Sequence, residues 1–104
     1  MRPVAFRRLL RRNSVTLAVY MLANDGGLLC HASNLEIAKA AGCSPAMVRE
    51  ALSGLVSDRV FEVFDWRDGI STRFIVLRDH PEADAFIAEV REIYGPHSRR
   101  AKDV

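Results

Sequence analysis

The sequence predicts a mostly α-helical domain with one small β-hairpin. Apolar residues recur at helical spacing in four segments. Helix-capping residues stand at the starts of three of these segments. Two runs rich in β-branched and aromatic residues flank Asp68 and Gly69, a dipeptide typical of hairpin turns. The 104 residues, 49% hydrophobic and 27% charged, suffice for one core and are too few for two packed domains.

The first predicted helix covers residues 4–24, where apolar residues recur every three or four positions. Asn13 and Ser14 interrupt the apolar face, and Ser14 is able to cap a helix, so two shorter helices are the alternative. Residues 24–27 are a strong turn signal, and residues 28–30 then predict a short strand. The apolar face of the helix consists of Phe6, Leu9, Leu10, Leu17, Ala18, Met21 and Leu22.

Two short helices separated by a tight turn come next. Ser33 and Glu36 have the spacing of a capping box, in which each side chain accepts a hydrogen bond from the other residue's amide. Gly42 is well placed to end this helix. Ser44 and Pro45 then predict a second helix that ends near residue 58. The apolar positions are Leu35, Ile37, Ala38 and Ala41 in the first helix, and Val48, Ala51, Leu52, Leu55 and Val56 in the second.

Residues 60–67 and 70–77 predict the two strands of the hairpin. A two-residue loop at Asp68 and Gly69 places Arg67 opposite Ile70 and Val63 opposite Phe74. The first face of the hairpin then carries Phe61, Val63, Ile70, Phe74 and Val76. The second, more mixed face carries Glu62, Phe64, Trp66, Ser71, Arg73 and Ile75.

The last predicted helix covers residues 79–95, from a cap at Asp79 to a stop at Gly95 and Pro96. One face is apolar and the other is mostly acidic, which makes a poor contact for DNA. We therefore expect the apolar face to pack on the first helix of the same chain or of a second chain. The residues expected at a homodimer interface are Phe86, Ile87, Val90 and Ile93. Residues 96–104 have no apolar anchor and are expected to form a disordered basic tail.

Charge is unevenly distributed along the chain. Residues 1–12 contain five arginines and no acid, whereas residues 13–95 contain twelve acids and seven bases. An acidic body with basic ends suits a partner such as nucleic acid, and a solvated arm is the alternative. No apolar run approaches the roughly 20 residues that span a bilayer. Without a signal-peptide pattern at the N-terminus, we expect a cytoplasmic, nucleoid-associated protein.

Residues with catalytic or metal-binding chemistry are few. Cys30, His31, Cys43 and His80 match no compact zinc spacing, and we expect both cysteines to be reduced thiols. No set of nucleophile, base and orienting residue stands out, and no glycine-rich phosphate loop is present. We therefore expect neither an enzyme nor a bound metal or cofactor.

The segment 34–53 resembles a helix-turn-helix. That family has a small residue in the first helix, a glycine in the turn and an aliphatic anchor in the second helix, and Ala38, Gly42 and Val48 match these positions. Two helices that cross steeply leave no room for a large side chain at the crossing. With the hairpin that follows, residues 14–78 resemble the winged helix-turn-helix domains of bacterial transcription regulators and of plasmid and phage replication initiators. Residues 1–13 then form a basic arm or helix extension.

The resemblance implies that residues 45–58 form a recognition helix that lies in the major groove of duplex DNA, with the hairpin as a wing on the backbone or minor groove. Arg49 is then able to donate hydrogen bonds to guanine. Glu50 either accepts a hydrogen bond from cytosine N4 or repels phosphate. The implied DNA-binding residues are Lys39, Ser44, Pro45, Ala46, Arg49, Glu50 and Ser53 on the two helices, Arg67 and Arg73 on the wing, and Arg7, Arg8, Arg11 and Arg12 on the arm.

These observations predict a sequence-specific DNA-binding homodimer that acts as a small transcription regulator. A DNA-binding module for plasmid or phage replication or partition would use the same residues. A winged-helix module that binds proteins and not DNA is the alternative of another class. It is favoured by the outward face of the recognition helix, which carries one base and one acid.

Overall fold

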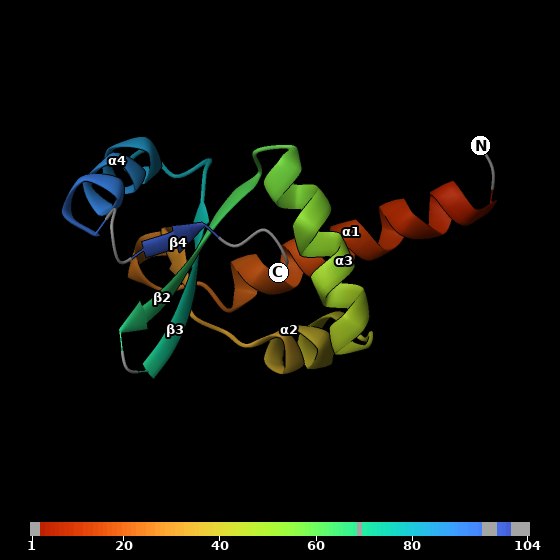
Figure 1. The fold of residues 1–104 in the computed structure, drawn as a ribbon. Coiled ribbons are helices and arrows are strands. Elements are labelled where there is room, and N and C mark those ends of the chain that lie inside the picture. Colours follow the sequence, from red (N-terminus) through yellow and green to blue (C-terminus); the bar gives the residue numbers. More distant parts are fainter. Residues whose placement is uncertain (1–2, 69, 95–97, 101–104) are drawn as a thin grey trace.

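The structure is a computed structural model that describes residues 3–68, 70–94 and 98–100, and within them the side chains of residues 11–65 and 73–93. Figure 1 shows α1, α2 and α3 on one side of the β-hairpin and α4 on the other. The fold is mostly helical with a small antiparallel sheet, which agrees with the predicted secondary-structure class. The elements are α1 (Pro3–Met21), the 3-10 turn η1 (Asp25–Gly27), β1 (Leu29–Cys30), α2 (Asn34–Ala41), α3 (Pro45–Ser57), β2 (Phe61–Asp68), β3 (Ile70–Leu77), α4 (Ala83–Tyr94) and β4 (Ser98–Arg100).

The sheet has the strand order β1-β3-β2-β4, and all three pairings are antiparallel. β2 and β3 form the predicted hairpin, and β1 pairs with the outer edge of β3. β4 pairs with the other edge of β2, where Asp65 is opposite Arg99. The prediction of a disordered tail over residues 96–104 is therefore wrong for 98–100, because the exposed backbone of an edge strand offers hydrogen bonds that apolar patterning does not reveal. The rest of that segment lies outside the described residues.

The register of the hairpin differs by one residue from the prediction. Val63 pairs with Ile75 and Phe64 with Phe74, and Asp68 itself pairs with Ile70. A shift of one residue moves every side chain of one strand to the opposite face. The sheet is covered on both faces, so apolar residues stand at consecutive positions of β3 and the sequence pattern did not discriminate between the two registers.

α1 is one continuous helix and not two, and its buried face is rotated relative to the prediction. Val15, Ala18 and Val19 are buried, whereas Leu17 is 63% exposed and Met21 is 77% exposed. The C-terminal end of α1 is tied to the loop before α4, because the Tyr20 hydroxyl donates to Asp79 at 2.7 Å. Partial burial, together with the Asp79 carboxylate, raises the pKa of Tyr20 to about 12.

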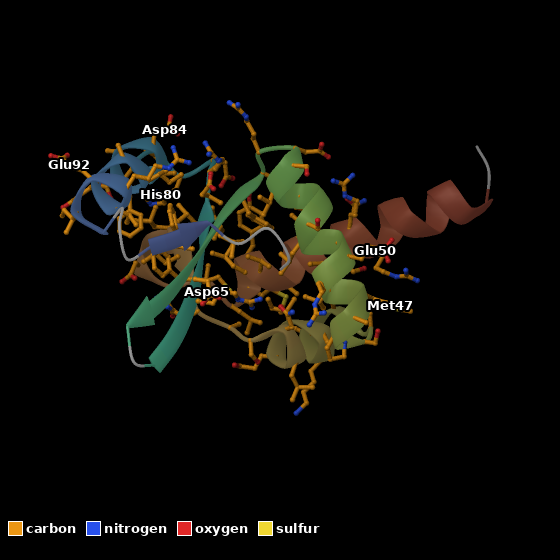
Figure 2. All side chains as sticks on the ribbon, viewed as in Figure 1. Met47, Glu50, Asp65, His80, Asp84 and Glu92 are labelled. Atoms are coloured by element: carbon orange, nitrogen blue, oxygen red, sulfur yellow. The ribbon has the colours of Figure 1, made fainter. Side chains whose placement is uncertain are left out.

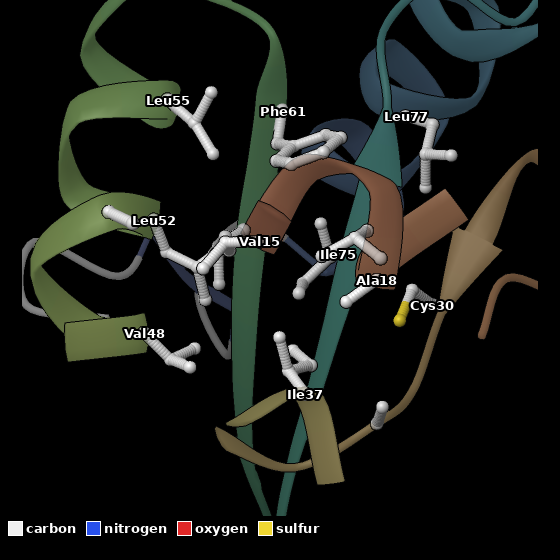
Figure 3. Close-up of a cluster of buried hydrophobic side chains, with 14 of the residues drawn as sticks. Val15, Ala18, Cys30, Ile37, Val48, Leu52, Leu55, Phe61, Ile75 and Leu77 are labelled. Carbon is white, nitrogen blue, oxygen red and sulfur yellow. The ribbon is translucent and has the colours of Figure 1, made fainter. Parts of the chain in front are cut away.

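The larger core lies between the three N-terminal helices and one face of the sheet (Figure 3). Val15 and Ala18 from α1, Ile37 from α2 and Leu52 from α3 meet there. The sheet contributes alternate residues of its two long strands, which are Phe61, Val63, Ile75 and Leu77. Burial of these side chains holds the helices at a fixed position relative to the hairpin.

A second, smaller core lies on the opposite face of the sheet, under α4. The expectation that α4 packs on the first helix of the same chain is therefore wrong, because its apolar face covers the sheet residues Phe64, Phe74 and Val76. The helix begins at Ala83 and not at residue 79. The preceding residues form a turn in which the His80 ring nitrogen Nδ1 accepts from the Glu82 amide at 3.0 Å.

A fully buried carboxylate stands beside this second core. Glu62 on β2 has an exposed fraction of 0% and forms an ion pair with Arg78, which follows β3. Arg91 of α4 approaches the same carboxylate oxygen at 3.4 Å. Arg78 also lies 3.8 Å from Asp84 near the start of α4. This network joins the hairpin to the last helix, and a buried carboxylate is stable only when such partners compensate for its lost hydration.

Candidate nucleic-acid interface

The predicted cap and stop of α2, and the tight turn that leads to α3, are present in the structure. Ser33 and Glu36 form both hydrogen bonds of the capping box at the start of α2. Gly42 ends the helix in the left-handed region with φ 72°, a conformation that favours glycine. The amides of Gly42 and Cys43 both donate to the carbonyl oxygen of Ala38, at 2.8 and 3.0 Å. The small side chain of Ala38 is buried at this crossing, as predicted.

The N-terminus of α3 is capped and open to solvent. The Ser44 hydroxyl accepts from the Met47 amide at 3.2 Å, and Pro45 occupies the first turn, where no backbone donor is needed. Ser44, Pro45 and Ala46 are all exposed. A helix N-terminus that projects amides into solvent carries a partial positive charge.

α3 presents a polar face to solvent. Its buried residues are Val48, Ala51, Leu52 and Leu55, and its exposed residues include Ala46, Arg49, Glu50 and Ser53, as the helical period predicted. Figure 2 shows Glu50 and Met47 on the side of α3 turned away from the sheet. Lys39 on α2 is exposed as well. Leu35, predicted among the apolar positions of α2, is instead 54% exposed.

The arm residue Arg12 is held by its own chain. Its guanidinium lies 2.5 Å from the Asp58 carboxylate at the end of α3. It also lies over Gly54, where an added Cβ would stand 2.8 Å from the Arg12 Nη2 atom. A cleft of about 310 Å³ opens between α1 and α3 here, and it is lined by Arg11, Arg12, Glu50, Ala51, Gly54, Ser57 and Asp58. The side chains of Arg7 and Arg8 lie outside the described residues.

Arg73 on β3, a predicted DNA contact, points toward its own chain. It donates to the Asn34 side chain and, at 2.6 Å, to the Ala32 carbonyl oxygen. Burial lowers the pKa of Arg73, and the nearby Cys30 and Asp65 oppose this shift. Arg73 therefore joins β3 to the start of α2. The side chain of Arg67 and the residue Gly69 lie outside the described residues.

The predicted dimer face of α4 is largely used within the chain. Ile87 and Val90 are buried in the smaller core, and the half-buried Phe86 packs edge-on against Phe74 with ring centroids 6.1 Å apart. Ile93 alone of the four predicted residues is mostly exposed, at 55%. This face is apolar because it covers the second side of the sheet, a role that the sequence pattern does not distinguish from dimerisation.

The cysteines and histidines that the structure describes belong to no candidate metal site. Cys30 is buried and Cys43 is half-buried, and both are free thiols. Burial raises the pKa of the Cys30 thiol. Among the residues whose placement is described, no three His, Cys, Asp or Glu side chains form a group able to hold a metal ion.

The sequence patterns did not indicate the ion pair of Arg12 with Asp58 at the end of α3, or the bond of Arg73 to Asn34 at the start of α2. They also did not indicate that Glu62 is buried beside the second core, where it pairs with Arg78. Each of these contacts joins residues far apart in the chain, and no local spacing in the sequence indicates it.

No helix in the described part of the chain is long and apolar enough to cross a membrane. Comparisons with protein-family models, curated proteins and solved structures find no match to this chain.

Proposed function

We propose that this protein is a winged helix-turn-helix protein that binds double-stranded DNA through the exposed face of α3. The observation that carries the proposal is the solvent-exposed face of α3, which follows a capped, open helix N-terminus and carries the polar residues Arg49, Glu50 and Ser53 beside Ala46. An α-helix is about 10–12 Å wide with its side chains and fits the major groove, which is about 12 Å wide.

The element order supports the winged-helix assignment. Three helices, a short β1, and a hairpin directly after the last of these helices occur in the order expected for that family. β1 pairs with β3, so β1 and the hairpin strands belong to one sheet, and α1, α2 and α3 pack on one face of this sheet. The steep junction of α2 and α3 is fixed by the Ala38 and Gly42 contacts described above.

Two exposed cations, Arg49 and Lys39, are the proposed contacts with DNA. Arg49 lies on the outer side of α3, where it is able to donate two hydrogen bonds to guanine O6 and N7. Lys39 lies on α2, where a contact with a phosphate would position the domain without reading sequence. Regulation of transcription is the role that best suits such a reader, and a replication or partition module would use the same face.

Binding to DNA is tested by titration of random and enriched duplexes at several salt concentrations. We expect the logarithm of affinity to fall by roughly 0.9 per log unit of salt for each phosphate neutralised. Arg49→Ala should cost about 1–3 kcal/mol at one base position and relax preference there. Lys39→Ala should weaken binding to all duplexes alike and reduce the salt slope by about 1.

The matched control is Arg91→Gln, which removes a cation from α4 on the opposite side of the sheet and should leave DNA affinity unchanged.

One observation favours a second candidate, a protein-binding module. The charges of Arg49 and Glu50 cancel on the exposed face of α3. Absence of salt-dependent binding to any duplex by the correctly folded protein would support that candidate and contradict the proposal.

A further inference from the structure

α1 carries an apolar stripe on the side turned away from its own core. Leu17 and Met21, one helical turn apart, are 63% and 77% exposed. Successive residues of an α-helix are rotated by about 100°, so the buried Val15 lies about 200° around the helix from Leu17. In the sequence, Phe6 and Leu10 continue the stripe at intervals of four and seven residues. This spacing is typical of a seam between two packed helices.

The N-terminal half of α1 projects beyond α3 and away from the sheet (Figure 1). The whole helix has 19 residues and is about 28 Å long. A helical segment gains most of its stability from packing of an apolar face, because isolated short helices are marginal in water. A second helix placed along the stripe would therefore stabilise this half of α1.

Charge indicates which helix fits. The N-terminal end of the chain carries five arginines within residues 1–12. At the other end of α1 lie the exposed carboxylates of Asp25 and Asp79, the second held beside the helix by the Tyr20 hydroxyl. Two copies of α1 that run antiparallel place the arginine-rich end of each beside the acidic end of the other. A parallel pair would bring the two arginine-rich ends together, where like charges repel.

We propose that a second copy of this chain covers the stripe, with the two α1 helices packed antiparallel about a two-fold axis near Ser14. In this arrangement Leu10 lies opposite the partner's Leu17, and Phe6 opposite the partner's Met21. The interface is self-complementary, as a two-fold dimer requires. It replaces the α4 face as the dimer surface, because Ile87 and Val90 are buried within their own chain.

The mass of the full-length chain without DNA, measured by sedimentation equilibrium, tests the proposal. We expect twice the monomer mass for the unchanged protein and the monomer mass for a Leu17→Glu, Met21→Glu double variant with an unchanged circular dichroism spectrum. Leu35→Glu, which changes a 54% exposed leucine on α2, is the matched control and should remain dimeric. A monomeric unchanged protein, or a double variant that stays dimeric, overturns the proposal. Neither result depends on DNA binding.

Cysteine cross-linking tests the orientation and does not require the double variant to fold. In a Cys43→Ser background, Ser14→Cys should form a disulfide-linked dimer on mild oxidation, because this position lies near the axis. Met21→Cys should not, because an antiparallel arrangement places the two copies of residue 21 at opposite ends. Cross-linking of Met21→Cys contradicts the antiparallel pair, whether or not Ser14→Cys also cross-links. Absence of cross-linking in both variants contradicts it as well.

Discussion

Replacement of Arg78 by alanine is expected to lower the free energy of unfolding by about 3–5 kcal/mol, as removal of one partner from a buried ion pair does in other proteins. The Glu62 carboxylate is fully buried and depends on Arg78 for its closest cation. Arg91, 3.4 Å away and about half exposed, does not compensate for the loss. Urea denaturation followed by circular dichroism measures the change.

Arg91→Ala is the matched control, because it removes the more distant and more exposed cation of the same carboxylate. We expect it to lower the free energy of unfolding by about 1 kcal/mol or less. A Glu62→Met, Arg78→Met double variant should recover much of the stability lost in Arg78→Ala, because it leaves no charge buried. If Arg78→Ala unfolds at the same urea concentration as the unchanged protein, the buried network does not hold α4 to the hairpin.

Phe61→Ala is expected to lower the free energy of unfolding by about 3–5 kcal/mol. Phe61 is fully buried at the start of β2, in the core that joins the helices to the sheet, and its ring lies 6.1 Å from that of Tyr20. Alanine removes the ring contacts and leaves a cavity that the surrounding helices fill only in part. Thermal and urea unfolding both report the loss.

Phe61→Leu retains most of the apolar volume and should cost less than Phe61→Ala, because the remaining cavity is smaller. Ile93→Ala, at a position that is 55% exposed, should change the free energy of unfolding by about 0.5 kcal/mol or less. Equal effects of Phe61→Ala and Ile93→Ala would contradict the position of the core described here.

The boundaries of α2 and α3 were predictable because cap and stop residues next to them in the sequence control these boundaries. The capping box of Ser33 and Glu36, the left-handed Gly42 and the Ser44 cap each act over three or four residues, so their spacing in the sequence contains the whole signal. The exposed face of α3 was predictable for a similar reason, since the period of the helix separates Val48 from Arg49.

The faces of α1 and of the hairpin were not predictable in the same way. Apolar residues lie on more than one side of α1, where Leu17 and Met21 are exposed, and on both sides of β3, whose two faces contribute to the two cores. Periodicity then indicates a helix or a strand without showing which side is inward. The same ambiguity places Leu17 on the predicted apolar face of α1 and shifts the predicted hairpin register by one residue.

The contacts of the charged residues at the candidate site depend on tertiary structure and were the least predictable from the sequence. Arg12 and Arg73 were predicted DNA contacts and are engaged by Asp58 and by Asn34 with Ala32, respectively. Their partners lie 46 and about 40 residues away in the chain, so sequence spacing carried no information about them. Lys39 and Arg49, whose exposure follows from helix geometry alone, lie where they were predicted.

Chemical-shift mapping tests whether the outer face of α3 contacts duplex DNA. An isotope-labelled sample is titrated with a duplex, and the backbone amide signals are followed residue by residue. We expect the largest shifts in residues 44–53 and at Lys39, with the amides of α4 unchanged. Shifts that are largest in α4, or no shifts at any duplex concentration, would show that α3 is not a DNA-binding surface.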